Sequence, residues 1–222
     1  MKVAVVCRGQ SLKALKTLPN DIDLYIIVNR FGDELQLPEV GPYLEGKNIF
    51  QILSRTPGEV EGMSTRGLYT KFNVQGIVQP YTIHMKNPKD FGDGNNKYYK
   101  FIDDKFFFCA EPTPIQATWL GDHHIEHMDT YQERYPHHYP SSGNAAVGYA
   151  VLDTGATEII LIGMDFYDVG YLADGGPGGP EDSQRMKDSV VRFVKNFPNK
   201  QFTIHTSGNL DCEFPNLKII KV

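Results

Sequence analysis

Short apolar runs rich in β-branched residues alternate along this chain with stretches of helical periodicity, and this alternation constrains its fold more than any other feature. Glycine, proline or polar residues bound each run, as they usually bound strands that are buried on both faces. Strands separated by helices are joined by right-handed crossovers, which place the strands in parallel and the helices on both faces of the sheet. The sequence therefore predicts an α/β fold with a mainly parallel sheet.

The pattern gives approximate bounds for each element. The expected strands lie at 3–7, 24–28, 49–53, 74–78, 106–109, 157–164, 202–204 and 217–222. A short helix is expected after the turn at 8–11, and residues 114–131 are compatible with another helix. A longer helix is expected to begin after Ser141-Ser142-Gly143, bury one apolar face and end at Gly155. A last helix carries apolar residues at helical spacing between Met186 and Phe197.

Residues 81–105 are rich in Asn, Lys, Asp, Gly and Tyr and have no clear periodicity. Such a stretch indicates an irregular insertion, a lid or a long surface loop. Neither an internal repeat nor a linker divides the chain, so residues 1–222 are expected to form a single domain.

Composition excludes several classes of protein. A formal net charge of -5 gives no support to nonspecific binding of nucleic acid through neutralisation of its phosphates. The 3 cysteines are scattered, without the CxxC spacing of a zinc site or a disulfide framework, which favours a reducing compartment and no bound metal. No apolar run is long enough for a signal-peptide core or an integral membrane segment, so we expect a cytoplasmic location.

Ligands of open α/β sheets bind at the carboxyl ends of the strands, where loops and helix N-termini converge. This rule selects residues 8–11, 29–30, 141–144 and 165–171. The turn at 8–11 is shorter than GxGxxG and lacks the lysine of a Walker loop, so neither a standard dinucleotide fingerprint nor a P-loop is present. A buried first strand that leads into a tight turn and a short helix is typical of nucleotide-binding α/β domains, so the expected ligand is a nucleotide.

Each of these segments also has a purely structural explanation. Gly9 is explained equally well by turn geometry and by close approach of the backbone to a ligand. Ser141, Ser142 and Gly143 suit a helix cap, although a capped helix N-terminus still attracts an anion through its remaining N–H groups. His205 ends the penultimate strand, where a surface or cap role competes with one in the crevice.

Residues 3–31 and 141–171 resemble, in the same order, the two signature regions of bacterial lipooligosaccharide sialyltransferases. The first region has a strand, a Gly-x-Ser-Leu turn, a helix and a Leu-Pro-Asn-Asp step into a second strand that ends in Asn. The matching residues here are Gly9, Ser11, Leu12, Leu18-Pro19-Asn20-Asp21 and Asn29. In the second region, Ser141-Ser142-Gly143 matches a helix start and Gly163-Met164-Asp165-Phe166-Tyr167 matches the end of a strand.

The resemblance implies a single Rossmann-like domain that transfers sialic acid from CMP-sialic acid to a sugar hydroxyl with inversion. It implies no essential metal and no cofactor besides the donor substrate. The implied nucleotide and donor contacts are Gly9, Ser11, Asn29, Ser141, Ser142 and Gly143. Tyr167 and Tyr171 are implied to bind the leaving phosphate, where phenolic donors stabilise developing negative charge.

Two departures from the family concern its catalytic groups. Tyr139 stands where the family has an arginine before its helix start, and Gly179-Pro180-Glu181-Asp182 stands where it has a catalytic histidine. Asp182, or Glu181 beside it, is our candidate for the general base that takes the proton of the acceptor hydroxyl. Both acids also suit the N-terminus of a helix, so a structural role explains them equally simply.

The leading hypothesis is a glycosyltransferase that binds a CMP-activated sugar donor and a glycan acceptor. One alternative is a nucleotide-sugar-binding protein that keeps the fold without transferring the sugar. Another is a metal-dependent hydrolase built on His123, His124 and His127, whose first and last members would share one helix face. The sequence leaves self-association open.

Overall fold

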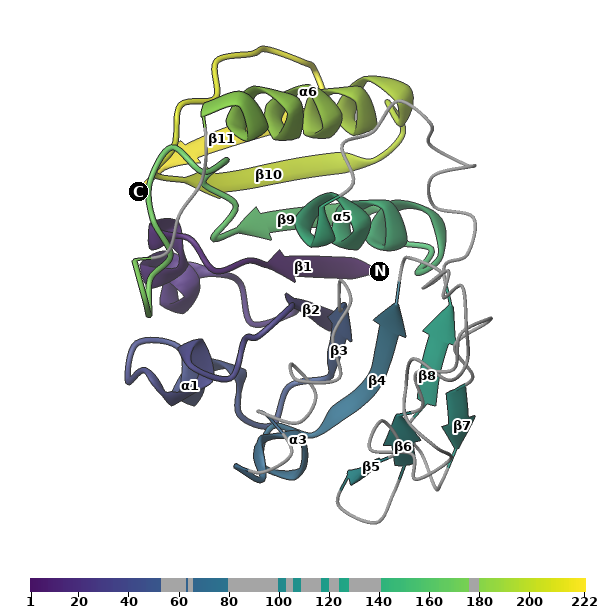
Figure 1. Cartoon of the computed structure of the whole chain (residues 1–222). Helices are drawn as coiled ribbons and strands as arrows, with labels where there is room; N and C mark the ends of the chain where they lie inside the picture. The colour runs from purple at the N-terminus through teal and green to yellow at the C-terminus, as the bar shows by residue number, and fades with distance from the viewer. Residues whose placement is uncertain are drawn as a thin grey trace, which may run out of the picture.

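The structure is a computed structural model of the chain (Figure 1) and describes residues 1–52, 63, 66–79, 100–102, 106–108, 117–119, 124–127, 141–175 and 180–222. The described strands are β1 (Lys2–Val6), β2 (Leu24–Val28), β3 (Ile49–Ile52), β4 (Val74–Gln79), β5 (Lys100–Ile102), β6 (Phe106–Phe108), β7 (Ala117–Trp119), β8 (His124–His127), β9 (Glu158–Ile162), β10 (Gln201–Thr206) and β11 (Leu217–Lys221). The described helices are η1 (Gln10–Thr17), η2 (Glu34–Gln36), α1 (Gly41–Leu44), α3 (Leu68–Lys71), α5 (Ser142–Leu152) and α6 (Pro180–Asn196), of which η1 and η2 are 3-10 helices.

The main sheet has 8 strands in the order β11-β10-β9-β1-β2-β3-β4-β8. Every neighbouring pair in it is parallel, which confirms the predicted fold class. The chain moves outward from β1 through β2 to β4, and β9, β10 and β11 later add strands on the other side of β1. The order therefore reverses between β1 and β9, and such a switch point is where open α/β sheets bind ligands. Strands β5, β6 and β7 form a separate antiparallel sheet.

The two central strands are buried on both faces. In β1, Val3 and Val5 join one hydrophobic core, whereas Ala4 and Val6 join the other, because successive side chains of a strand point to opposite faces. The first core is closed by α5 and α6, and the second by η1, α1 and α3. Helices therefore cover both faces of the sheet, as the sequence predicted, and Figure 1 shows α5 and α6 on its near side.

Helix α5 is more deeply buried than its sequence pattern predicted. Every residue from Ser142 to Val151 is buried, where the pattern predicted one apolar face. Small residues allow this burial, since they let α5 approach β1, β2 and α6 closely. The expectation of an amphipathic helix was wrong because a helix that is apolar or small all round can be enclosed completely. Ser141 caps it, its Oγ accepting the N–H of Asn144 at 3.2 Å.

The prediction of a helix over residues 114–131 is wrong. Strands β7 and β8 lie within this range, and β8 pairs in parallel with β4 at one edge of the main sheet. A pairing between segments so distant in the sequence overrides the local helix-compatible composition. Most of the predicted insertion at 81–105 lies outside the described residues.

One strand boundary bears directly on the site. Strand β9 ends at Ile162, short of the predicted Met164, because Gly163 has a left-handed φ of 71°. A Cβ at Gly163 would collide with the carbonyl oxygen of Cys7. This position therefore requires glycine, and the chain turns here to begin the loop that follows β9. Within the described part of the chain, no helix combines the length and apolar character needed to cross a bilayer.

Candidate functional site

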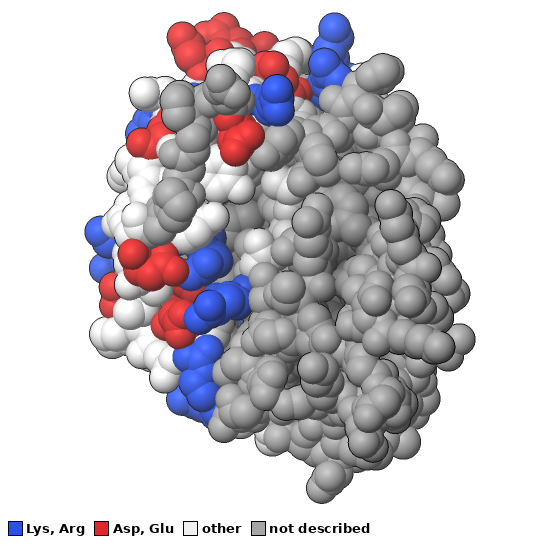
Figure 2. Space-filling model, viewed as in Figure 1, with Lys and Arg blue, Asp and Glu red and all other residues white. Residues whose placement is uncertain are grey.

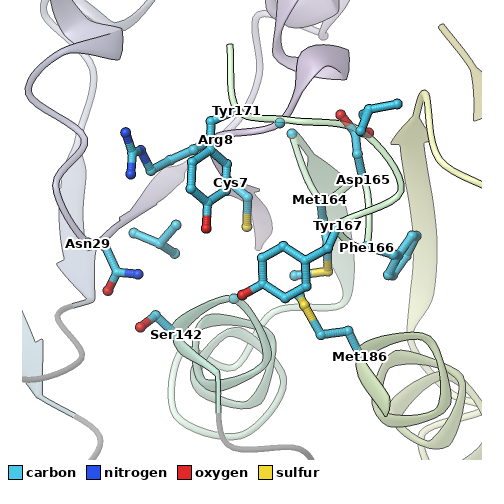
Figure 3. Close-up of a pocket in the computed structure, with 15 residues that line it drawn as sticks. Cys7, Arg8, Asn29, Ser142, Met164, Asp165, Phe166, Tyr167, Tyr171 and Met186 are labelled. Atoms are coloured by element: carbon cyan, nitrogen blue, oxygen red, sulfur yellow. The ribbon is translucent and has the colours of Figure 1, made fainter. Parts of the chain in front are cut away.

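A cavity opens at the carboxyl ends of β1, β2 and β9, at the switch point of the main sheet (Figure 3). It encloses about 480 Å³ of empty space, part of which is open to solvent. Its walls come from the loop after β1, the end of β2, the first turn of α5 and the loop after β9, with Met186 of α6 completing them. The edge that the rule for open α/β sheets selected is therefore the one at which this cavity lies.

Of the residues that the sequence selected, those lining this cavity are Gly9, Asn29, Ser142, Gly143, Tyr167 and Tyr171. They come from segments that are far apart in the sequence, and the fold brings them together. Figure 3 shows the hydroxyls of Tyr167 and Tyr171 pointing into the same space, which also faces Ser142 and Asn29. A shared binding site requires these residues to lie around one cavity, as they do here.

Two of the selected serines lie outside the cavity wall. Ser11 is fully buried, and its hydroxyl accepts the N–H of Gly163 at 2.9 Å. Ser141 serves as the N-cap of α5, as described above. In this structure both hydroxyls shape the cavity by fixing backbone and do not line it.

Asp182 also lies outside the cavity wall. It is half-buried in the first turn of α6, one turn before Met186, which does line the cavity. Residues four apart share one face of a helix, so Asp182 lies on the same side of α6 as Met186. Tyr139 and Gly179 lie outside the described residues.

The first turn of α5 has the features of an anion-binding site. The Ser142 side chain is buried, and its Oγ has no hydrogen-bond partner among the described residues, although it lines the cavity. The first hydrogen bond of the helix is donated by the N–H of Ala145 to the carbonyl oxygen of Ser141. The N–H groups of Ser142 and Gly143 come before this bond, at the N-terminus of α5. Such N–H groups, together with the helix dipole, favour a phosphate or carboxylate.

Gly9 is required in the turn after β1, since a Cβ there would collide with the carboxylate of Asp165 and with the carbonyl oxygen of Gly163. Glycine therefore lets the backbone of this turn approach the loop after β9. A Cβ at Gly143 would lie 2.9 Å from Cε of Met164, the far end of a flexible side chain, so the restriction at Gly143 is milder.

The loop after β9 has an unusual backbone conformation at Phe166 and Tyr167. Phe166 and Tyr167 have φ angles of 56° and 59°, in the left-handed region that few non-glycine residues adopt. Asn29 at the end of β2 has a φ of 52° and also lines the cavity. Left-handed non-glycine residues persist where surrounding contacts fix them, and they cluster at functional sites.

The Tyr171 ring lies edge-on to the Tyr167 ring, with centroids 6.5 Å apart. A β-bridge joins the backbone of Tyr171 to Gly9, and Gln10 Nε2 donates to the Tyr171 carbonyl oxygen at 2.9 Å. Burial raises the pKa of the Tyr171 phenol, although Arg8 and the Tyr167 hydroxyl act in the opposite direction. The phenol therefore remains a protonated hydrogen-bond donor at neutral pH.

Asp165 holds the loops of this edge together. Its Oδ2 accepts the N–H of Ser11 at 2.8 Å, and its Oδ1 accepts the N–H of Ser207 at 2.8 Å and the hydroxyl of Thr206 at 3.1 Å. One buried carboxylate thus connects the loops that follow β1, β9 and β10. Its oxygens are occupied by the protein itself, so we assign Asp165 a structural role.

Sequence reasoning did not select Cys7 or Met186 as cavity residues, and it selected the turn at 8–11 without giving Arg8 a role. Burial raises the pKa of the Cys7 thiol well above its usual value, with Asp165 adding to the effect, so this thiol is not a nucleophile. Arg8 had a signal in the sequence, because it is a cationic residue directly after a predicted buried strand. Met186 had none beyond its apolar helical spacing.

The histidine group expected to suit a metal no longer shares a helix face. His124 and His127 lie in strand β8, and His123 lies outside the described residues. Among the described residues, no group of three His, Cys, Asp or Glu side chains is arranged to hold a metal ion. The geometric basis for the hydrolase hypothesis is therefore lost.

His205 faces the second core and lies outside the cavity wall. It pairs in register with Ile162, whose side chain belongs to that core, and only 7% of its surface is exposed. Burial lowers its pKa below 6.5, and nearby Lys218 of β11 lowers it further. His205 is thus kept neutral inside the fold, and the crevice role considered for it does not apply.

This burial predicts a loss of stability in mild acid. Below about pH 6.5 the unfolded chain binds a proton at His205 that the folded chain resists, so stability must fall as the pH falls. His205→Gln should remove this contribution. Urea unfolding at about pH 7.5 and about pH 5.5 should show a smaller loss of stability in the variant than in the wild type. An equal loss in both proteins would contradict the prediction.

Acidic and basic side chains are interspersed on the described part of the face shown in Figure 2. Several Lys and Arg side chains lie in a column beside the residues that are not described, with acidic side chains next to them.

No family model matches this chain, and no curated protein matches it in sequence. Among solved structures it is similar to the sialyltransferase CST-II in complex with a trisaccharide acceptor and CMP, with 19% identity over 92% of this chain and 80% of that one and a TM-score of 0.54. A CST-II variant with phenylalanine in place of a tyrosine, in complex with CMP, matches at 18% identity, with a TM-score of 0.54 and coverage of 91% and 80%. At these identities the similarity shows a shared fold.

Proposed function

We propose that this protein is a glycosyltransferase that moves sialic acid, or a related sugar, from a CMP-activated donor to a hydroxyl group of a glycan. The observation that carries the proposal is that Gly9, Ser142 and Tyr167, selected from separate motifs, line one cavity at the switch point of the sheet. The shared fold with an enzyme whose structure contains CMP and a trisaccharide supports the same class of ligands.

The cavity has groups suited to each part of such a donor. The backbone at Gly9 and the side chain of Asn29 form the wall on which we place the cytidine nucleotide. The α5 N-terminus, with the Ser142 hydroxyl, offers N–H and O–H donors to the anionic groups of the donor. Ser11 and Ser141 then support this wall indirectly, through the backbone that they fix.

The two tyrosines suit the departure of CMP. In the proposed step the acceptor oxygen bonds to the anomeric carbon while the bond from that carbon to the phosphate oxygen breaks. CMP leaves with the bonding electron pair, and the acceptor proton passes to a base. The phenols of Tyr167 and Tyr171 donate to the phosphate as its charge grows, without a metal ion. A single displacement of this kind inverts the anomeric centre.

Asp182 remains our candidate for the base that receives the acceptor proton. It lies on the side of α6 that reaches the cavity through Met186. We propose that a bound acceptor occupies the space between this carboxylate and the donor sugar. Transfer that survives unchanged in Asp182→Ala would remove Asp182 from this role.

Isothermal titration calorimetry with CMP, UDP and GDP tests the nucleotide assignment directly. Selective binding of CMP is expected, with affinity lost in Ser142→Val, which removes the hydroxyl and fills the cavity beside it. Thr17→Val is the matched control, because the Thr17 hydroxyl donates to Ala14 O outside the cavity wall. Absence of binding to every nucleotide would contradict the proposal.

A nucleotide-sugar-binding protein without transferase activity is the second candidate. It is favoured by the position of Asp182 outside the cavity wall in the described structure. The two candidates differ in one measurement, the release of CMP from CMP-sialic acid in the presence of a glycan acceptor. Tight donor binding with no CMP release beyond the uncatalysed rate would select the binding protein.

A further inference from the structure

Arg8 sits at the edge of the cavity in a cluster that the proposed chemistry does not use. Its Nε donates to Oε1 of Glu34 at 2.7 Å, and its Nη2 donates to Oδ2 of Asp174 at 3.0 Å. Its guanidinium carbon lies 4.5 Å from the centroid of the Tyr171 ring. The cation is therefore fixed by two carboxylates and stacked on one of the two cavity tyrosines.

The cluster is largely buried. The Glu34 side chain is fully buried and that of Arg8 is 11% exposed, whereas Asp174 is 51% exposed. Arg8 comes from the loop after β1, Glu34 from η2 and Asp174 from the loop after β9. The guanidinium thus joins three segments around one ring.

Backbone contacts bring the loop that carries Tyr171 to Arg8. The Arg8 side chain then packs on the Tyr171 ring. The carbonyl oxygen of Arg8 accepts the N–H of Leu172 at 2.7 Å, next to the bridge between Gly9 and Tyr171. These bonds fix the backbone of Tyr171 but leave its side-chain torsions free. The guanidinium face packs on the ring, and Tyr167 contacts it both through its ring edge and through its hydroxyl.

A direct phosphate clamp is the obvious alternative role for a cationic residue here. Arg8, however, pairs with two carboxylates, so the cluster carries no surplus positive charge for a phosphate. In Figure 3 the guanidinium lies beside the Tyr171 ring and away from Ser142, where the anion-binding groups of α5 begin. The charge of Arg8 is paired with carboxylates of the protein, and its flat face packs on the Tyr171 ring.

We propose that Arg8 is a positioning residue that holds the Tyr171 ring so that its hydroxyl faces the same space as that of Tyr167. The inference rests on the proposed function for its catalytic consequence, although the position of the ring does not depend on it. A planar guanidinium suits this task, because it stacks on an aromatic face while its edge donates to carboxylates. Lysine carries the same charge, but its ammonium group lacks the planar shape and the forked N–H donors of a guanidinium.

The test must avoid leaving a buried carboxylate without its partner. Arg8→Gln alone would strand Glu34, and such unpaired buried charges unfold proteins. The informative variants are therefore Arg8→Gln/Glu34→Gln, in which both charges are removed, and Arg8→Lys, in which the charge remains. Arg66→Gln is the control, since Arg66 pairs with Asp33 outside the cavity wall.

The first readout needs no donor. Carbon-13 NMR of ring-labelled tyrosine, with Tyr171→Phe for assignment, follows the titration of the Tyr171 phenol. Because Arg8 lowers the pKa of that phenol, the double variant should raise it further, and Arg66→Gln should leave it unchanged. An unchanged titration in the double variant would overturn the inference, whether or not the protein transfers a sugar.

The second readout is steady-state transfer from CMP-sialic acid. Both Arg8 variants should lower kcat by about tenfold, the size of a lost cation–π contact, with the KM of the donor changed less than about twofold. A raised donor KM at unchanged kcat would overturn the inference in favour of a phosphate clamp. If the wild type transfers no sugar, the proposed function fails, and the NMR titration still tests the contact between Arg8 and the Tyr171 ring.

Discussion

Replacing Tyr167 and Tyr171 together by phenylalanine is expected to slow sugar transfer by about a hundredfold to a thousandfold, the usual cost of losing donors to a developing anion. Both hydroxyls point into the cavity beside the anion-binding turn of α5 (Figure 3). Because the phosphate gains charge only as CMP departs, the loss should fall on kcat and leave the KM of the donor nearly unchanged. Release of CMP from CMP-sialic acid, followed under steady-state conditions, measures both.

The two single variants show whether the phenols act together. Each should lose less than the double variant, and the combined loss should differ from the sum of the two free-energy changes if both phenols bind one group. Tyr43→Phe is the matched control, because Tyr43 is 42% exposed and lies outside the cavity wall. A double variant with wild-type kcat would exclude the tyrosines from the chemistry.

Asp165→Asn is expected to cost about 3 kcal/mol or more in the free energy of unfolding, a large part of the stability of a domain. In the wild type, two backbone N–H groups and one hydroxyl donate to the Asp165 carboxylate. An amide replaces one acceptor oxygen by a donor, which would then face the N–H of Ser11 or Ser207 across a buried gap. Urea unfolding followed by circular dichroism measures the difference.

Asp211→Asn provides the comparison for this variant. Asp211 follows the same strand, β10, but its side chain is exposed, so the free energy of unfolding should change by less than about 0.5 kcal/mol. Equal stability of the Asp165 and Asp211 variants would show that the carboxylate does not connect the loops in the way described.

The sheet could be predicted from the sequence because its strands carry their own signal. In β1 and β2, every residue but the first of β1 is buried and most are β-branched, so the local pattern and the final environment agree. The edge strand β8 lacks that agreement. Its Ile125 favours a strand, but the flanking histidines and Glu126 fit a helix equally well, and only pairing with the distant β4 decides.

The site was predictable in its location and less so in its side chains. Gly9 and Tyr167 follow predicted strands, and topology alone places such residues at one edge. The direction of the Ser11 side chain depends on the hydrogen bond that its hydroxyl accepts from the N–H of Gly163, which lies 152 residues away in the sequence. The role of Arg8 could not be predicted for the same reason, since its partners Glu34 and Asp174 lie 26 and 166 residues away.

The burial of α5 from Ser142 to Val151 links the folding of the core to the shape of the cavity. Since these residues are enclosed, the first turn of the helix cannot move without disrupting the packing around it. A properly folded molecule therefore has this turn, where we propose that an anion binds, in place before any ligand arrives. Variants that fold normally but fail to bind a ligand will then have lost an individual contact, whereas variants that damage this helix will lose binding and folding in a single transition.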